Sequence, residues 1–222
     1  MESYFDPSAP GSFGGLKALM CQSKRSVKDV KEYLLDKDAY TLHKTYKLKF
    51  KRRKTFSKGI NDLWQLDLVD VSNISAYNDS HKFLFTCIDV FSRFARVLAI
   101  KNKTGKTITE AFSKMIALAK PLLVQTDKGT EYLNTNFQKL LRDNDIKHYT
   151  SENDYIKCAL VERFNRTLKT KMYKYFTHKN TLKYIDVIDD LVASYNNTYH
   201  STIKMSLSEV TAQNEHKLHR WL

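Results

Sequence analysis

The stretch that most constrains the fold is the amphipathic segment Cys158–Phe176, CALVERFNRTLKTKMYKYF. Its apolar residues recur at helical spacing, which predicts one helix with an apolar face packed on a core. The opposite face carries four polar residues at i, i+3, i+4 and i+7: Glu162, Asn165, Arg166 and Lys169. A carboxylate flanked by cations suits a group that holds a metal ion while its neighbours hold phosphates. The alternative is a solvated face with a Glu162–Arg166 ion pair.

Length and composition indicate a globular chain. With 222 residues, 42% hydrophobic and 12% aromatic, it can bury the core of one large domain, with or without a small appendage. We find no apolar run of transmembrane length and no signal-peptide pattern at the start of the sequence. The three cysteines, Cys21, Cys87 and Cys158, are widely spaced and odd in number. This usage indicates a reducing compartment without a disulfide framework.

The charge balance points to an anionic partner. The formal net charge is +13, and residues 24–58 hold 13 Lys and Arg against 4 Asp and Glu. Such a balance favours nucleic acid or an anionic membrane. The aromatic content and the lack of a basic amphipathic anchor favour nucleic acid.

The first 60 residues read as a basic segment of short helices. Residues 1–15 contain Pro and Gly at loop-like density, and Ser26–Leu35 has helical spacing with Ser26 as its N-cap. Such a segment is either a small DNA-binding module or an arm packed on the main domain. The basic run that follows contains Lys51, Arg52, Arg53 and Lys54. It can contact DNA phosphates, act as a nuclear-localisation signal, or serve as a solvated linker.

Residues 61–210 read as the main domain and residues 211–222 as a tail. We predict strands at 64–71, 82–90, 96–100, 122–125 and 146–149, the first three forming a meander. We predict helices at 104–119, 136–144, 158–176 and 184–199, with Thr107 and Glu110 as a capping box for the first of these. This order predicts an α/β fold with a five-stranded sheet flanked by helices.

Three acids stand out against this framework. Asp67 lies within the apolar strand WQLDLVDV, where a carboxylate is costly unless it is paired or binds a metal ion. Asp127 follows the strand LLVQ, beside a glycine-bearing turn, and Glu162 lies near the start of the long helix. An α/β sandwich gathers strand ends and loops around one region, so we expect the three acids to lie together.

The blocks that surround these acids carry a family resemblance. In order they are QLDLVD, IDVFSR, QTDKGTEY and VERFNRTLK, and 34 residues separate Asp127 from Glu162. Over residues 62–209 the chain resembles the retroviral integrase catalytic core, the D–D–E branch of the ribonuclease-H-like polynucleotidyl transferases. The segments YFDPSAPGSFGG, DAYTLHK and NNTYH further resemble the integrases of Polinton/Maverick transposons and related DNA viruses.

The resemblance implies a ribonuclease-H-like fold and a metal-dependent reaction on DNA. Asp67 would bridge two Mg²⁺ or Mn²⁺ ions, with Asp127 on one ion and Glu162 on the other, as hard oxygen ligands suit these metals. The reaction would trim a 3′ end of element DNA and join the freed 3′ hydroxyl to a target phosphodiester. A nuclease that uses water as its nucleophile, and a domesticated DNA-binding protein with a silent site, are the alternatives.

The same resemblance implies the partners. Arg166 and Lys169 would contact donor-DNA phosphates, Asn165 would support the site, and residues 150–157 resemble the active-site loop. The partners would be element-end and target double-stranded DNA, bound by a homodimer that forms a tetramer on DNA, with no membrane. The protein would act in the host nucleus, or in a virion or viral factory if virus-encoded.

Several further residues have weaker claims to a role. Residues 1–60 contain Cys21 and His43 as their sole Cys and His, so we expect no zinc site of the integrase type there. Asp70 should point away from the face of Asp67, and Asp89 should have a hydrogen-bonding role. Glu131 could support Asp127. The acids of the last long helix should form a solvated face; they are Asp186, Asp189 and Asp190.

Overall fold

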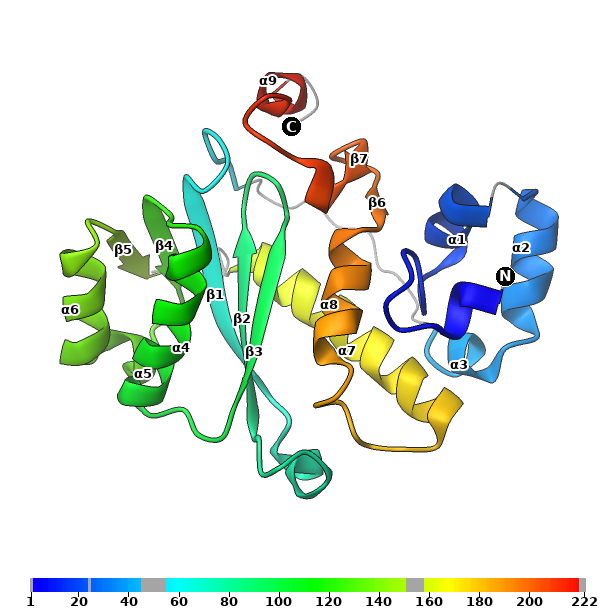
Figure 1. Ribbon diagram of the computed structural model, residues 1–222, viewed down its shortest axis with the longest axis horizontal. Coiled ribbons are helices and arrows are strands. Elements are labelled where there is room, and N and C mark those ends of the chain that lie inside the picture. Colours follow the sequence, from blue (N-terminus) through cyan, green and yellow to red (C-terminus); the bar gives the residue numbers. More distant parts are fainter. Residues whose placement is uncertain (1, 24, 45–54, 151–157, 220–222) are drawn as a thin grey trace. The chain divides into compact units, whose positions relative to one another are not determined.

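The computed structural model describes residues 2–23, 25–44, 55–150 and 158–219. The chain forms two compact units, one of residues 53–165 and one that combines residues 1–52 with 166–222 (Figure 1). The division passes through the long helix α7 (Ala159–Lys179). The expected functional segments 1–60, 61–210 and 211–222 stay predictions.

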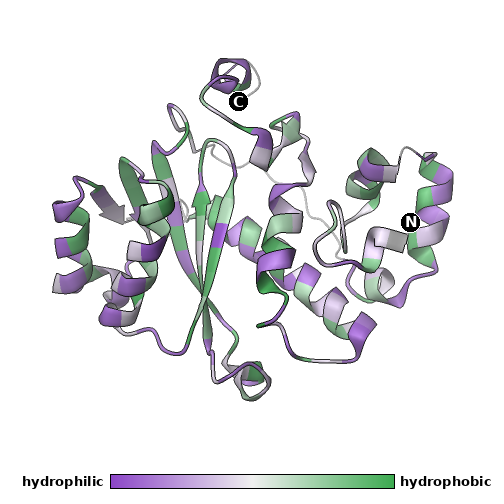
Figure 2. Ribbon diagram, viewed as in Figure 1, coloured by the Kyte–Doolittle hydropathy of each residue, from purple (hydrophilic) through white to green (hydrophobic). Residues whose placement is uncertain are grey.

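The unit of residues 53–165 is built on the mixed five-stranded sheet that the sequence predicts. Its strands are β1 (Leu63–Asp70), β2 (Phe83–Asp89), β3 (Ala95–Ile100), β4 (Leu123–Thr126) and β5 (Lys147–Thr150). Their order is β3-β2-β1-β4-β5, with β1, β2 and β3 antiparallel and β4 parallel to both β1 and β5. Hydrophobic residues predominate along the central strands (Figure 2), which is typical of strands buried on both faces.

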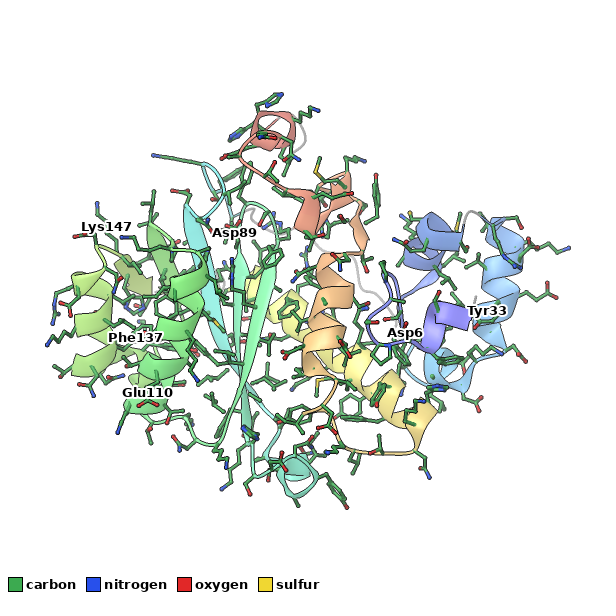
Figure 3. The ribbon with its side chains drawn as sticks, in the orientation of Figure 1. Asp6, Tyr33, Asp89, Glu110, Phe137 and Lys147 are labelled. Atoms are coloured by element: carbon green, nitrogen blue, oxygen red, sulfur yellow. The ribbon has the colours of Figure 1, made fainter. Side chains whose placement is uncertain are left out.

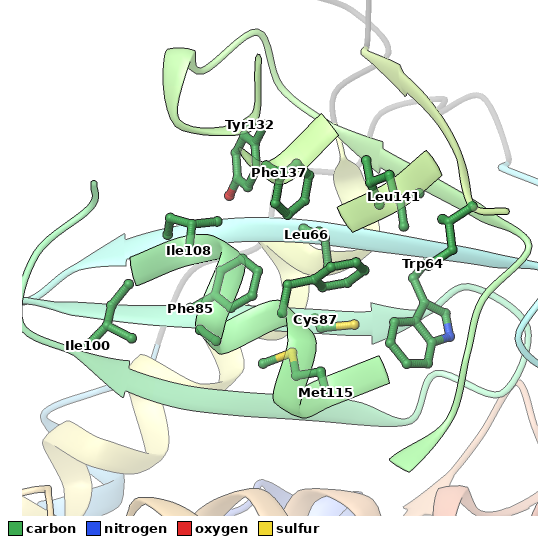
Figure 4. Packing of buried hydrophobic residues seen from close by; sticks show 14 residues of the cluster. Trp64, Leu66, Phe85, Cys87, Ile100, Ile108, Met115, Tyr132, Phe137 and Leu141 are labelled. Carbon is green, nitrogen blue, oxygen red and sulfur yellow. The ribbon is translucent and has the colours of Figure 1, made fainter. Parts of the chain in front are cut away.

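Helices cover one face of this sheet. They are α4 (Gly105–Leu118), α5 (Thr130–Leu133) and α6 (Thr135–Asp143), and a 3₁₀ turn, η2 (Ser72–Tyr77), follows β1. Trp64, Leu66, Phe85 and Cys87 point from β1 and β2 into a core closed by the apolar stripes of α4 and α6 (Figure 4). The apolar stripe of α4 consists of Ile108, Ala111, Phe112 and Met115.

The start of α4 differs from the expected capping box. Thr104 is the N-cap, and its hydroxyl oxygen accepts from the backbone N–H of Thr107 at 3.4 Å. The Thr107 hydroxyl instead donates to the Asn102 side-chain oxygen at 2.6 Å. The helix therefore begins at Gly105, and the capping box of Thr107 with Glu110 was wrong because Thr107 already lies inside the helix.

The second unit opens with the short helices expected from the basic segment. They are η1 (Glu2–Phe5), α1 (Leu16–Ser23), α2 (Val27–Leu35) and α3 (Asp38–Thr41). Ser26 caps α2, as predicted, by accepting from the N–H of Asp29 at 3.2 Å. Tyr4, Leu19, Val30 and Leu34 pack together as a small core.

The C-terminal part of this unit follows α7. It contains α8 (Ile188–Asn196), β6 (Tyr199–His200), β7 (Met205–Ser206), η3 (Leu207–Glu209) and α9 (Glu215–Leu218). The helix expected over 184–199 starts four residues later, because Tyr184–Val187 forms a turn that is closed by a 2.9 Å backbone hydrogen bond. Within the described ranges, every helix is too short or too polar to cross a membrane.

Candidate active site

Asp67 lies in the middle of β1, opposite Thr86 of β2. One carboxylate oxygen, Oδ1, accepts from the N–H of Leu68 at 2.8 Å, and the other, Oδ2, accepts from the Asn165 side-chain amide at 2.8 Å. Burial raises the pKa of Asp67 to about 6, and the negative charges of Asp127 and Glu162 contribute to the rise. The charges of the other two acids found by sequence therefore act on Asp67 in the folded protein.

Asp127 follows the end of β4 and is exposed. Its Oδ1 accepts from the backbone N–H of Gly129 at 3.1 Å, which closes a tight turn. A Cβ at position 129 would lie 2.6 Å from the Glu131 carboxyl carbon, so glycine is what lets Glu131 fold back over this turn. Glu131 thus packs on the turn that carries Asp127, in agreement with a supporting position.

A chain of hydrogen bonds fixes the backbone just before this turn. The Thr126 hydroxyl donates to the Asp127 carbonyl at 2.7 Å, so it must accept from His148 Nε2 at 2.9 Å. His148 Nδ1 then accepts from the Gln138 amide at 2.9 Å, and that amide also donates to the Tyr132 carbonyl at 2.8 Å. This arrangement requires a neutral His148. Burial favours the same neutral form, because it lowers the pKa of His148.

Glu162 is partly buried in the first turn of α7. The helix begins against β1, because Gln65 Oε1 accepts from the N–H groups of Leu160 and Val161 at 3.0 and 3.2 Å. These N–H groups belong to the helix's first turn, where no carbonyl of the helix can pair with them. The carboxylate of Glu162 is therefore carried on a helix start that is bound directly to the strand of Asp67.

The donor set suits a divalent cation of the hard type. Carboxylate oxygens are the ligands that Mg²⁺ and Mn²⁺ prefer, and a cation would relieve the mutual repulsion that contributes to the pKa of Asp67. Two buried polar atoms near Asp67, Asn165 Oδ1 and the Tyr132 hydroxyl, have no hydrogen-bond partner among the residues described. Across the described ranges, no three His, Cys, Asp or Glu side chains stand close enough to hold a metal ion. The acids would therefore have to draw together around it.

The structure separates the other candidates from these three acids. Asp70 is exposed at the end of β1. Asp89 ends β2 (Figure 3), and its carboxylate accepts from the Ser92 hydroxyl and N–H at 2.5 and 3.1 Å. Asp89 is thus a structural acid, as expected. Of the proposed DNA contacts, Arg166 and Lys169 are exposed on α7.

One expectation for α7 was wrong. Asn165 does not share a solvated face with Arg166 and Lys169, since it is 7% exposed and its amide is bonded to Asp67. The basic-run residues Lys51, Arg52, Arg53 and Lys54, and the expected loop 150–157 beyond Thr150, lie outside the described residues.

Sequence reasoning missed two glutamines that join the acid-bearing elements. Gln65 and Gln125 are register partners on the parallel strands β1 and β4, and the Gln65 amide donates to Gln125 Oε1 at 2.8 Å. The signal was available in the sequence, because each glutamine precedes an acid by two residues, in QLD and in QTD. Alternation along a strand puts residues i and i+2 on one face.

A family comparison agrees with this arrangement. Residues 58–154 match the family described as the integrase core domain. The HTLV-2 integrase catalytic core domain, solved with magnesium in trimeric and dimeric forms, is similar to this chain at 25% identity, with TM-scores of 0.59 and 0.58. Each alignment covers 70% of this chain and 99% of that domain. The chain has the ribonuclease-H-like fold of the integrase core.

Curated relatives point the same way over a shorter stretch. An uncharacterised transposon-derived protein of Caenorhabditis elegans is 39% identical over 124 residues, which is 54% of this chain and 43% of that protein. The Gag-Pro-Pol polyprotein of human T-cell leukemia virus 3 is 31% identical over 124 residues, 55% of this chain and 8% of the polyprotein. The chain thus matches less than half the length of these relatives. Together the comparisons support a retroviral-type integrase catalytic core.

A chain within a larger solved assembly has the same fold. The simian T-cell lymphotropic virus intasome, solved in complex with a PP2A regulatory subunit, matches 88% of this chain and 67% of the solved chain, with a TM-score of 0.66. At 22% identity this likeness concerns the fold alone.

Proposed function

We propose that the protein is a DNA integrase that processes a 3′ end of element DNA and joins it to target DNA. The observation that carries this proposal is that Asp67, Asp127 and Glu162 stand on β1, just after β4 and at the start of α7, three elements that hydrogen bonds join in an integrase-type fold. The similarity to integrase catalytic cores supports the same reaction class. The C. elegans relative, a transposon-derived protein, supports a mobile element as the origin, and we assign that element to the Polinton/Maverick type on the sequence blocks named above.

In this proposal the three carboxylates hold two divalent cations, Mg²⁺ or Mn²⁺. Bound there, the cations would supply Lewis-acid activation of the attacking oxygen and stabilisation of the departing 3′ oxygen. Asp67, which is partly buried on β1, would hold the cations together with Asp127 and Glu162, whose charges contribute to its raised pKa. Asn165 holds Oδ2 of Asp67 through a 2.8 Å hydrogen bond and so keeps the carboxylate turned toward the site.

The cationic residues of α7 complete the proposed arrangement with DNA. Arg166 and Lys169 follow Glu162 by four and seven residues on the same helix and are exposed, so they are available to donor phosphates. The net charge of +13 supports an interaction dominated by phosphate contacts. A dimer that assembles into a tetramer on DNA, acting in the host nucleus or a viral factory, belongs to the same proposal.

A strand-transfer assay tests this function. The protein is mixed with a recessed-3′ donor duplex that carries the element's terminal sequence, a supercoiled plasmid and Mg²⁺, with Glu162→Gln as the matched control. We expect joined product from the wild type and none from the variant. Metal-dependent cleavage without joining would instead establish a nuclease. Retained DNA binding without either reaction would establish a silent DNA-binding protein.

A further inference from the structure

The acids of the candidate site stand next to a pair of buried glutamines. Gln65 and Gln125 are 0% and 3% exposed, and they face each other across the parallel pair β1–β4. Gln65 and Asp67 are two residues apart within β1, so they lie on the same face of that strand. Gln125 precedes Asp127 by two residues, at the point where β4 ends.

Hydrogen bonding fixes which way the Gln65 amide points. Its Oε1 accepts from two backbone N–H groups, those of Leu160 and Val161, so this end of the side chain must be the oxygen. Its Nε2 then faces Gln125 and donates to Gln125 Oε1 at 2.8 Å. One side chain thus binds three elements together: β1 through its own backbone, β4 through Gln125, and α7 through two N–H groups.

These three elements are the ones that carry the three acids. Asp67 lies two residues after Gln65 on β1, Asp127 lies two residues after Gln125, and Glu162 directly follows Val161. A change in the length or chemistry of the Gln65 side chain would shift the start of α7 relative to both strands. A misplacement of about 1 Å is enough to impair a site that depends on convergent ligands.

We propose that Gln65 is a positioning residue that holds the start of α7 against β1, so that Glu162 is placed to join Asp67 and Asp127 around a metal ion. It touches neither the metal ions nor DNA, and it acts through the first turn of α7. The inference rests on the proposed function, since it concerns the same carboxylate site. Gln125 is the brace that holds Gln65 in the orientation in which its oxygen faces the helix.

The experiment measures binding of Mn²⁺ alone to the whole protein, by the loss of the free-ion signal in electron paramagnetic resonance. Gln65→Met keeps the size of the side chain but removes both polar ends. Asn78→Ala is the matched control. Asn78 is also a fully buried amide of the same unit, and it donates to the Ile74 carbonyl at 2.8 Å, away from the acids. Thermal melting is recorded for every variant.

We expect the Mn²⁺ dissociation constant of Gln65→Met to rise about tenfold or more, as for other residues that orient metal ligands. The Mn²⁺ dissociation constant of Asn78→Ala should stay within about twofold of the wild-type value, even if the melting temperature of this variant falls as far as that of Gln65→Met. Equal Mn²⁺ affinity in the wild type and Gln65→Met would overturn the inference and leave the proposed function standing. Equal losses in both variants would overturn it too, because they would reflect general destabilisation.

Two further outcomes keep the test decisive. If Gln65→Met does not fold, Gln125→Met replaces it, since that change leaves the bonds of Gln65 to α7 and removes their brace. We expect a smaller loss of Mn²⁺ affinity, about threefold, and unchanged affinity would overturn the inference. If the folded wild type binds no Mn²⁺ at millimolar concentration, the proposed function itself fails, and this result differs from every outcome above.

Discussion

Each unit of the molecule buries charge, and the two do so in opposite ways. In the sheet unit the charge is Asp67, with a neighbouring amide and one N–H as its hydrogen-bond donors and two further acids in its field. In the other unit the charges are Lys171 and Lys174 of α7, which are 5% and 4% exposed. Burial raises the pKa of the acid to about 6 and lowers those of the lysines to about 7 and 8.

The buried lysines donate to oxygen atoms of their own unit. Lys171 donates to the Ser12 carbonyl at 2.6 Å and to the Ser194 hydroxyl at 2.9 Å. Lys174 donates to the Phe13 carbonyl at 3.1 Å. The Ser194 hydroxyl in turn donates to the Ala9 carbonyl at 2.7 Å, so the N-terminal loop is bound to α7 and α8 by these side chains.

The difference separates a charge that holds the fold from a charge kept for a ligand. Lys171 and Lys174 use backbone carbonyls that a buried loop would otherwise leave unpaired, so they complete a hydrogen-bond network. Asp67 lies with two other acids in its field and with an unpartnered Asn165 Oδ1 nearby, among the residues that the structure describes. A bound cation would add nothing to the lysine network, whereas it would stabilise the charge of Asp67.

The largest expected effect comes from removing the acid. Asp67→Asn should lower strand transfer or cleavage by about a thousandfold, since the lost metal binding is worth several kcal/mol of transition-state stabilisation. The metal-free melting temperature should stay level or rise, because a repelled buried charge is removed. Parallel activity assays and thermal melts measure both. An active variant would show that Asp67 is a structural acid, like Asp89.

Removing a buried lysine should instead lower the stability of the protein. Lys171→Ala should lower the free energy of unfolding by about 2 kcal/mol, because it removes the ammonium that donates to the buried Ser12 carbonyl and to Ser194. Lys169→Ala, two residues earlier and exposed, should change it by less than about 0.5 kcal/mol. Urea titrations of both variants give the difference. Equal stability would mean that the buried ammonium contributes nothing to holding the N-terminal loop.

Exposed charge on the same helix should matter for DNA instead. The double variant Arg166→Ala and Lys169→Ala should keep the wild-type melting temperature and bind donor duplex about tenfold more weakly. The slope of log affinity against log salt should fall by about 2, one for each lost phosphate contact. Fluorescence anisotropy over a range of salt concentrations measures it. An unchanged slope would remove these two residues from the DNA interface.

The sequence predicted the elements of the sheet unit closely, because each follows from a local apolar pattern. The strands around Trp64 and Phe85 and the helix 104–119 are found within a residue or so of their predicted bounds. The three acids came from their places in the predicted strands and helix, together with the spacing of the family that the chain resembles. Their electrostatic coupling needed coordinates, because it depends on the pairing of β1 with β4 and on the point where α7 begins.

The missed features all depend on contacts between distant parts of the sequence. Lys171 reads as a solvated residue, and its burial depends on a loop that lies 159 residues earlier. Gln65 reads as a polar residue in a strand, and its role depends on a helix 95 residues later. No local pattern of hydrophobicity carries such information. The repeated Q-x-D pattern is the one signal that could have pointed to the glutamine pair.

The smallest expected effect is the change of stability with pH. Its sign differs between the two units, because one buried group is an acid and the others are bases. The folded-state pKa of Asp67 lies above its ordinary value of 3.8, so metal-free protein should lose stability from this group as pH rises through about 4 to 6. Those of Lys171 and Lys174 lie below 10.5, so their contribution should be gained as pH rises above about 7.

Matched variants isolate the two contributions. The melting temperature of Asp67→Asn should rise relative to wild type by a few degrees between pH 4 and 6.5. That of Lys171→Met should fall relative to wild type by a similar amount between pH 7 and 9. Added Mg²⁺ should diminish the first difference, since a cation at the acids replaces the proton, and should leave the second unchanged. An equal response of both differences to Mg²⁺ would contradict the assignment of one buried charge to a ligand and the other to the fold.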